Sequence, residues 1–392
     1  MLGCAALLLL VPVTVLLAEV LLALTTRAQE RETRAGGMRP RLAVVVPAHN
    51  EAAVVADTIR SLLPQLSPAD RLLVVADNCC DETAAIAAAA GAQVIERSDT
   101  TRRGKGFALD FGVHHLRADA PQIVVVIDAD CAVTDGALDR LACDCAQSGR
   151  PVQALYLMHT GNNAGLRMRL AEFAWIVKNQ VRPLGLHRLG LPCQLMGSGM
   201  AFPWATLAAA TLATGHITED LRLGVDLARA GSPPLFCPEA LVTSTFPVTN
   251  EGVQTQRTRW EHGHLGMILS DSARLFVDSI VRLSPRLMAL SLDLSVPPLA
   301  LLTLQIATVW FASALLAHLT ATRFPLRIST AALTTLALAV FLAWARYGRR
   351  IVSLGDLAFS AVYAVLKIPV YAKFLVARQL DWVRSKRDGG ES

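Results

Sequence analysis

Between about residue 40 and residue 285, short apolar runs alternate with segments of helical periodicity. The apolar runs are rich in β-branched residues and read RLAVVVPA, RLLVVAD, AQVIER and QIVVVIDAD. The helices expected between them cover residues 51–66, 82–90 and 105–116. Buried strands separated by helices of this length are typical of a parallel sheet with helices on both faces. The pattern predicts an α/β fold with a mostly parallel sheet for residues 40–285.

Polar side chains follow three of the predicted strands, in the sequences HNE, DN and DAD. In open parallel sheets, ligands bind beyond the carboxyl ends of the strands. We therefore expect a binding site at this edge of the sheet.

Long apolar segments lie at the two ends of the chain. Residues 1–26 form one predicted transmembrane helix, and residues 286–378 form a membrane region with two spans, at 296–321 and 328–345. Residues 351–376 carry charges and are expected to lie on the membrane or to re-enter it. Arginines follow the first span directly, which places residues 40–285 and the basic tail 379–392 in the cytoplasm.

The composition agrees with a water-exposed domain carried on membrane segments. Of the 392 residues, 53% are hydrophobic and 18% are charged, which is too apolar for an ordinary soluble enzyme. The net charge of +5 suits an anionic leaflet, whereas nucleic acid is a poor partner because only 6% of residues are aromatic and no basic stripe is present. The eight cysteines lack metal-type spacing, so reduced cytoplasmic thiols are expected.

The two acids of VVVIDAD are candidate metal ligands. If the chain stays extended, Asp128 and Asp130 point to one side and share one hard cation. The alternative is that one acid caps the next helix and the other is a solvated loop residue.

Two later motifs supply further candidates. In HITEDLRLG, Asp220 is either a general base or an acid in the first turn of a helix. In QRTRW, Arg259 and Trp260 lie on one face of a predicted helix, where they suit a phosphate and a sugar ring. The alternative for that pair is a position at the membrane interface.

Taken in order, VVVPAHNEA, ADNCCDET, RRGKGFAL, DAD, TED and QRTRW resemble the membrane-bound glycosyltransferases of family 2. That family includes cellulose, chitin and hyaluronan synthases and, more loosely, ceramide glucosyltransferase. The resemblance implies a GT-A (Rossmann-like) fold, an inverting transfer, a nucleotide-sugar donor, usually a UDP-sugar, and a divalent metal, Mn²⁺ or Mg²⁺. It covers the whole region between the membrane segments.

The resemblance also assigns roles to single residues. The residues expected to bind the donor are Ala48, His49, Glu51, Asp77, Lys105, Asp128 and Arg259. Asp77 holds the base, and Asp128 and Asp130 bind the metal. A solvated basic turn is the alternative for Lys105. Cys80 stands where Ser or Thr is common, which leaves the details of base recognition open.

On the acceptor side, the resemblance makes Asp220 the catalytic base. The residues expected near the acceptor are Gly197, Ser198, Glu219 and Trp260.

Three spans are too few to enclose a polysaccharide alone. We expect addition to a lipid-linked or growing glycan in exopolysaccharide or cell-envelope synthesis, with oligomerisation or an exporter for a polymer. The alternatives are a single addition to a membrane lipid and a non-catalytic membrane scaffold that binds nucleotide-sugar. The Ala-, Leu- and Arg-rich composition suggests a bacterial inner membrane.

Overall fold

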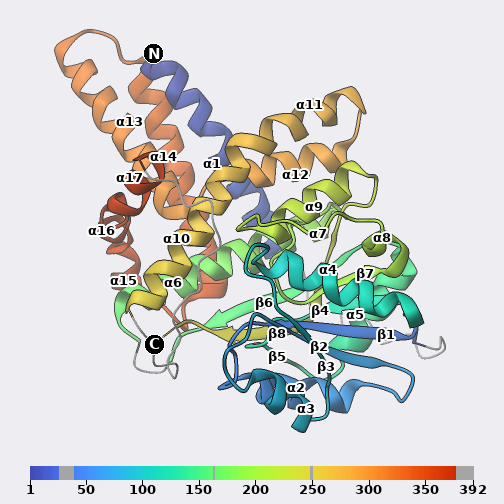
Figure 1. Cartoon of the computed structure of the whole chain (residues 1–392). Helices are drawn as coiled ribbons and strands as arrows, with labels where there is room; N and C mark the ends of the chain where they lie inside the picture. Colours follow the sequence, from blue (N-terminus) through green and yellow to red (C-terminus); the bar gives the residue numbers. More distant parts are fainter. Residues whose placement is uncertain (26–38, 162–163, 248–249, 377–392) are drawn as a thin grey trace. The chain divides into compact units, whose positions relative to one another are not determined.

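The fold is that of a computed structural model, which describes residues 1–25, 39–161, 164–247 and 250–376 (Figure 1). The described residues form two compact units. The sheet unit contains residues 39–159 and 192–263, and the helical unit contains residues 1–25, 160–191 and 264–376. The basic tail 379–392 and the arginines that follow the first span, up to residue 38, lie outside the described residues.

The sheet unit is built on one sheet of eight strands in the order β3-β2-β1-β4-β7-β6-β8-β5. The strands are β1 (Leu42–Ala48), β2 (Arg71–Asp77), β3 (Gln93–Arg97), β4 (Ile123–Val126), β5 (Ala132–Val133), β6 (Val152–His159), β7 (Met200–Pro203) and β8 (Leu235–Thr245). Strands β3, β2, β1 and β4 are parallel neighbours, as are β6 and β8, whereas β7 runs antiparallel to β4 and β6 and β5 antiparallel to β8. The predicted α/β class and mostly parallel sheet are confirmed.

Helices connect these strands, and the three predicted ranges, 51–66, 82–90 and 105–116, contain α2 with η1, α3 and α4. They are α2 (Val55–Leu62), η1 (Leu63–Gln65), α3 (Thr83–Ala89), α4 (Lys105–Leu116), η2 (Arg117–Asp119), α5 (Ala137–Ser148), α8 (Trp204–Ala208), α9 (Glu219–Arg229) and the first part of α10 (Asn250–Met267). Helix α4 has the predicted bounds, and Gly112 lets it lie against the sheet, because a Cβ there would be 3.0 Å from Val75.

The strand in VVVIDAD is shorter than the sequence suggested. Strand β4 ends at Val126, and the following residues form a turn in which the Cys131 amide donates to the Asp128 carbonyl at 3.1 Å. The expected extended geometry of Asp128 and Asp130 is therefore wrong, although the turn still brings the two side chains together.

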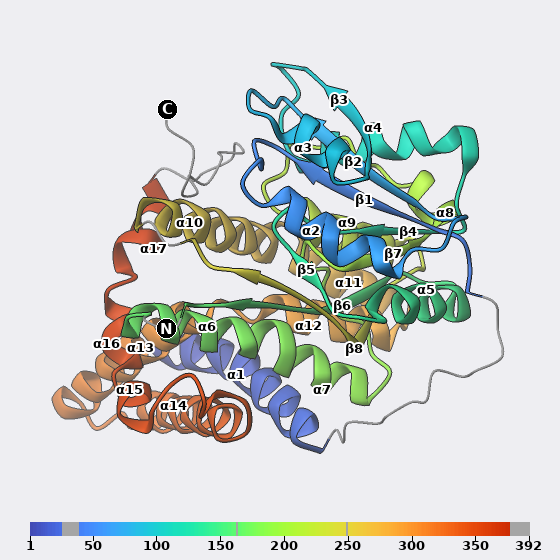
Figure 2. The same cartoon turned by 90° about the horizontal axis from the view of Figure 1, so that it is seen from below.

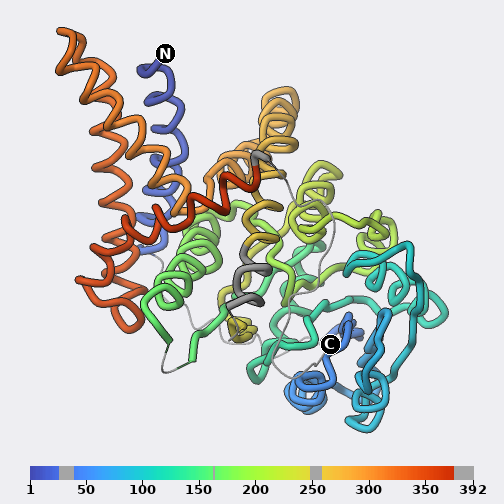
Figure 3. The backbone as a smooth tube through the Cα atoms, turned by 60° about the vertical axis from the view of Figure 1, so that its left-hand side comes forward, coloured from blue at the N-terminus to red at the C-terminus, as the bar shows by residue number. Residues whose placement is uncertain are grey.

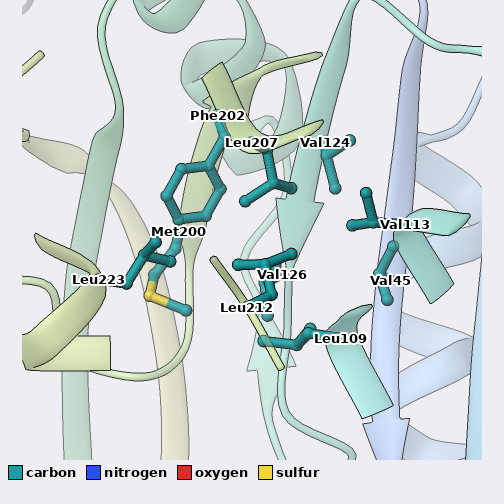
Figure 4. A pocket seen from close by; sticks show the side chains of 10 residues that line it. All are labelled: Val45, Leu109, Val113, Val124, Val126, Met200, Phe202, Leu207, Leu212 and Leu223. Atoms are coloured by element: carbon teal, nitrogen blue, oxygen red, sulfur yellow. The ribbon is translucent and has the colours of Figure 1, made fainter. Parts of the chain in front are cut away.

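An apolar core lies between α4 and the middle of the sheet (Figure 4). The side chains that meet there are Val45, Leu109, Val113, Val124, Val126, Met200, Phe202, Leu207, Leu212 and Leu223. They leave a cavity of about 10 Å³, counted as the space open to the centre of a water molecule. Because its lining is apolar, a water there would lack hydrogen-bond partners.

The helical unit contains three helices long and apolar enough to cross a membrane: α1 (Leu2–Thr25), α13 (Leu299–Leu319) and α14 (Phe324–Ala343), which η5 extends to Gly348. They lie side by side in Figures 1 and 3. Each overlaps a predicted span. The third apolar stretch forms three short helices, α15 (Leu354–Ala358), α16 (Ser360–Val365) and α17 (Ile368–Val376), so among the described residues it adds no span.

The remaining helices of this unit are α6 (Leu166–Ile176), η3 (Val177–Val181), α7 (Arg182–Arg188), η4 (Ile268–Ser272), α11 (Ala273–Val281) and α12 (Pro285–Ser295). Figure 2 shows α6 and α7 running beside α1. Helix α7 approaches α1 closely, because a Cβ at Gly185 would lie 2.1 Å from the Glu19 carbonyl oxygen.

A buried ion triad ties three helices of the helical unit together. Arg182 of α7 donates from Nε to Glu19 of α1 at 3.0 Å and from Nη2 to Asp293 of α12 at 2.6 Å. Each of the three side chains is at most 5% exposed. Removing Arg182 would leave two buried carboxylates without a counter-charge, and breaking a buried pair in this way typically costs about 3–5 kcal/mol.

Candidate active site

Three carboxylates from two separate segments, Asp128, Glu219 and Asp220, gather around Lys105 at the carboxyl edge of the sheet. Lys105 opens α4, where its Nζ pairs with Asp128 and donates to the Gly197 carbonyl oxygen at 2.6 Å. Gly197 also marks the position of Asp220, since a Cβ on this glycine would lie 3.4 Å from Asp220 Oδ2 and 4.0 Å from Asp128 Oδ2. Asp128 and Asp220, which are far apart in sequence, therefore face the same small space.

The GSG sequence itself, Gly197 to Gly199, supports the backbone at Asp128. The Asp128 amide donates to Ser198 Oγ at 3.0 Å, and Gln153 Nε2 donates to the Ser198 carbonyl at 2.8 Å. Gly199 completes the contact, because its amide donates to the Val126 carbonyl at 2.9 Å and its φ is +71°. A Cβ at Gly199 would lie 2.6 Å from Ala154, so this position requires glycine.

Asp130 is held by the other half of the sheet. Ser244 of β8 donates to Asp130 Oδ2 at 2.7 Å. Side-chain ligand atoms of Asp128, Asp130 and Cys131 all lie within 4.8 Å of one another. Burial and the neighbouring acids raise the pKa of the Cys131 thiol well above its usual value, and Ser198 Oγ donates to its sulfur at 3.2 Å. The two carboxylates are therefore the oxygen ligands that this cluster offers.

The electrostatics of the cluster are dominated by negative charge. Burial, with the negative charge of Asp220, raises the pKa of Glu219 to about 7, while Lys105 and Arg259 oppose the rise. Burial also raises the pKa of Asp128. The negative charges of Asp130 and Asp220 raise it further, and the positive charge of Lys105 offsets only part of the rise. Burial would lower the pKa of Lys105, but Asp128 and Glu219 outweigh it and raise that pKa. The site is short of positive charge.

Helix α10 approaches the TED sequence at one glycine. A Cβ at Gly263 would lie 2.2 Å from Thr218 Cγ2, so only glycine allows this separation. Arg259 and Trp260 lie one turn before Gly263 and are half-buried. Arg259 is close enough to Glu219 to oppose the rise in its pKa. The structure thus brings the predicted Arg259 and the TED acids together.

The predicted base-binding residues lie where β1 and β2 end. His49 Nδ1 donates to the Asp77 carbonyl at 2.6 Å, and the Cys79 thiol donates to the Ala48 carbonyl at 3.5 Å. The Glu51 amide donates to Thr83 Oγ1 at 2.8 Å. The turns at these strand ends are joined to each other, which gives the edge a fixed shape.

The carboxylate of Asp77 is shared in a way that the sequence did not reveal. Arg97 Nη1 donates to Asp77 Oδ1 at 2.6 Å, and Asn78 Nδ2 donates to the same oxygen at 3.0 Å. The position of Arg97 is set by the parallel pairing of β2 and β3, which places it opposite Asp77. Ser244 and Gln153 were also not expected from the sequence, because a polar residue type alone does not mark a site residue.

Comparisons with known proteins agree with this arrangement. Residues 40–263, more than half of the chain, match the family model described as glycosyltransferase like family 2. The probable glycosyltransferase YdaM of Bacillus subtilis is 24% identical over 264 residues, which is 60% of this chain and 58% of that protein. An uncharacterized glycosyltransferase of Mycobacterium bovis is 36% identical over 120 residues, which is 29% of this chain and 50% of that protein. The chain thus matches only about half of the length of these relatives.

Among solved structures, the mannosyltransferase PcManGT of Pyrobaculum calidifontis, in complex with GDP-Man and Mn²⁺, has a TM-score of 0.59 and 16% identity. The match covers 97% of this chain and 100% of that chain. Glucosyl-3-phosphoglycerate synthase of Mycobacterium tuberculosis, in complex with Mn²⁺, UDP and phosphoglyceric acid, has a TM-score of 0.39 and 21% identity over 58% of this chain and 78% of that chain. The expected GT-A fold is confirmed. Both of these solved proteins hold Mn²⁺.

Proposed function

Because the chain belongs to glycosyltransferase-like family 2 and is therefore a transferase, we propose that it moves a sugar from a nucleotide-sugar to a hydroxyl of a membrane-bound acceptor. One observation carries the proposal. Asp128, Glu219 and Asp220 converge on Lys105 at the sheet edge, and Asp130 lies beside Asp128. The pKa values of Asp128 and Glu219 are raised, and the positive charges that oppose this are Lys105 at both acids and Arg259 at Glu219. Such a site favours a divalent cation together with the diphosphate that it accompanies.

The residues present fit Mn²⁺ or Mg²⁺. Asp128 and Asp130 offer carboxylate oxygens within 4.8 Å of one another, and both ions prefer oxygen ligands. When bound, the ion would stabilise negative charge on the departing diphosphate. Lys105, whose Nζ lies on Asp128, and Arg259 would add their positive charges to the same phosphates.

Asp220 is the proposed catalytic base. Its carboxylate accepts the proton of the acceptor hydroxyl, whose oxygen attacks the anomeric carbon as the bond to the diphosphate breaks. A single displacement of this kind inverts the anomeric centre. Glu219, Gly197 and Trp260 line the acceptor side, where the indole offers a flat surface to a sugar ring. Ser198 is fully buried and shapes that side through its bond to Asp128.

We place a UDP-sugar first among donors. Asp77 Oδ1 already accepts from Arg97 and Asn78, which leaves Oδ2 as the oxygen with room for the base. A uracil ring presents a single imide N–H, whereas guanine presents two adjacent donors that best suit both carboxylate oxygens. Ala48, His49 and Glu51 form the surrounding wall of the pocket.

The acceptor is a lipid, a lipid-linked glycan or a growing glycan of the cell envelope. Three candidate spans among the described residues support a membrane location. We place the sheet unit in the cytoplasm of a bacterial cell, at the inner membrane. A single addition to a membrane lipid is the closest alternative, and product length separates it from polymer synthesis. A homo-oligomer or an exporter would be needed only for the polymer.

The test is nucleotide release from UDP-glucose, UDP-galactose, UDP-N-acetylglucosamine, UDP-glucuronate and GDP-mannose by protein in nanodiscs with added lipid extract. Release with Mn²⁺ or Mg²⁺ that is lost with chelator and in Asp220→Asn is expected. Asp226→Asn is the matched control, because Asp226 lies on the same helix in an exposed pair with Arg222. Donor binding without release in the wild-type protein would favour the scaffold alternative.

A further inference from the structure

Helix α11 exposes an apolar stripe that no described part of the helical unit covers. Phe276, Val277, Ile280 and Val281 are 41%, 56%, 52% and 77% exposed, and their spacing puts them on one side of the helix. The opposite side is used for packing, since Leu275 and Ser279 are at most 2% exposed and α11 packs on α12. The exposed stripe is therefore not needed to hold the two helices together.

The turn after α11 adds a leucine in an unfavourable conformation. Leu283 is 88% exposed and has a φ of +48°, a value that glycine adopts far more readily than leucine. Hydrogen bonds from the Ser284 amide to the Ser279 carbonyl at 2.9 Å and from the Leu283 amide to the Ile280 carbonyl at 3.1 Å form the usual helix-ending motif. In water, an exposed leucine at this position would not stabilise the folded protein relative to glycine.

Basic side chains flank the stripe. Arg274, Arg282 and Arg286 are all exposed, and they lie at the two ends of α11 and at the start of α12. Within α11 and the turn that follows it, Asp278 is the acidic residue. An apolar stripe with arginines on its border is typical of helices that lie in a membrane interface and contact anionic headgroups.

The buried triad sets the level of this hairpin along the first span. Arg182 joins Asp293 of α12 to Glu19 of α1, and Glu19 lies six residues before the end of α1 at Thr25. At a rise of 1.5 Å per residue, Glu19 is about 9 Å from that end. The headgroup region extends about 5–8 Å beyond the apolar core on each side. Figure 1 shows α11 and α12 running across the direction of α1, α13 and α14.

We propose that the α11–α12 hairpin is a second, non-spanning membrane anchor, which inserts its apolar stripe and Leu283 into one leaflet while Arg274, Arg282 and Arg286 bind anionic phospholipid headgroups. The apolar stripe of the hairpin thus adds to the lipid-contacting surface of α1, α13 and α14. This anchor is independent of the proposed transfer reaction, since none of its residues belongs to the candidate active site.

The test uses full-length protein in nanodiscs with an environment-sensitive fluorophore at single cysteines placed at Val277 or Leu283. In these two labelled proteins the exposed Cys4, Cys80 and Cys143 are first replaced by serine, and in a third, comparison protein only Cys4 and Cys80 are replaced. We expect blue-shifted emission and at least about twofold quenching by lipids that carry a spin label near the headgroup, with more quenching in phosphatidylglycerol than in phosphatidylcholine. A label on retained Cys143 of α5 is the comparison, and it should emit as in water.

A second variant guards against misfolding. Leu283→Gly suits the backbone of the turn, so its melting temperature should be equal to or above that of the wild-type protein, while a label at Val277 becomes less quenched. Charge reversal of Arg274 and Arg282 should remove the preference for phosphatidylglycerol. Water-like emission at both positions would overturn the proposal. Blue-shifted emission without lipid quenching would also overturn it, since the stripe would then be covered by protein, such as a second copy of the chain.

Discussion

Gly263 allows the sharpest test of how the site is assembled. Its missing side chain lets α10 approach Thr218, since a Cβ at residue 263 would lie 2.2 Å from Thr218 Cγ2. An ordinary carbon contact is about 3.5 Å or longer, so Gly263→Ala must separate the two segments by about 1 Å. A displacement of that size near reacting groups typically lowers the rate by about 100-fold. Arg259 and Trp260 would move away from Glu219 and Asp220.

The assay is nucleotide release with the best wild-type donor, combined with a thermal melt. Gly263→Ala should lower turnover by about 100-fold and the free energy of unfolding by about 1–3 kcal/mol, as overpacking usually does. Gly165→Ala is the matched control. Gly165 is the N-cap residue of α6, and a Cβ added there would have nothing within 4 Å. It should leave turnover unchanged.

Thr218→Ser supplies a rescue. Serine lacks Cγ2, and the next atoms, Thr218 Oγ1 and Cβ, lie 3.1 Å and 3.2 Å from the added carbon. The turnover of the double variant should therefore be about tenfold higher than that of Gly263→Ala alone. Such a non-additive effect is expected only for groups in contact. Wild-type turnover in Gly263→Ala, or a double variant no better than the single one, would refute the reasoning.

Three further outcomes follow from the sheet unit. Since Glu219 has a pKa of about 7 instead of 4.5, the free energy of unfolding of metal-free protein should fall as the pH rises from about 4.5 to about 7, by up to about 3 kcal/mol; melts in Glu219→Gln should lack this fall, and an equal fall would contradict the assignment. Lys105→Met removes the cation on Asp128, so Mn²⁺ without nucleotide should bind about tenfold more tightly by calorimetry while turnover drops; weaker Mn²⁺ binding would argue against a shared site. Leu207→Ala enlarges the cavity in Figure 4 and should lower the free energy of unfolding by about 2–5 kcal/mol, which an unchanged melting temperature would disprove.

The elements with strong periodicity were predictable from the sequence. Helix α4 and the first span have their expected bounds, because apolar spacing and length depend on few neighbours. The gathering of Asp77, Asp128 and the Lys105 turn at one edge followed from the rule for parallel strands. What failed was local: β4 ends at Val126, since Asp128 and its successors gain more from bonds to Ser198 and to their own turn than from further pairing.

Contacts between distant segments could not be predicted from the sequence. Arg97 reaches Asp77 only because β3 pairs with β2 in one register. Residues 160–191 carry no pattern that separates them from the neighbouring soluble helices, yet they group with the apolar helices of the helical unit. Arg182 is one contact that joins them, because it pairs with acids on α1 and α12.

The Arg182 triad also constrains how this protein can evolve. A lineage that loses Glu19 or Asp293 keeps a buried guanidinium with one carboxylate partner instead of two. A lineage that replaces Arg182 leaves two buried carboxylates close together without a counter-charge. Loss of the whole set to apolar residues of similar volume avoids both penalties. Positions 19, 182 and 293 should therefore change together across orthologues, so that the amino acid at one position forecasts those at the other two.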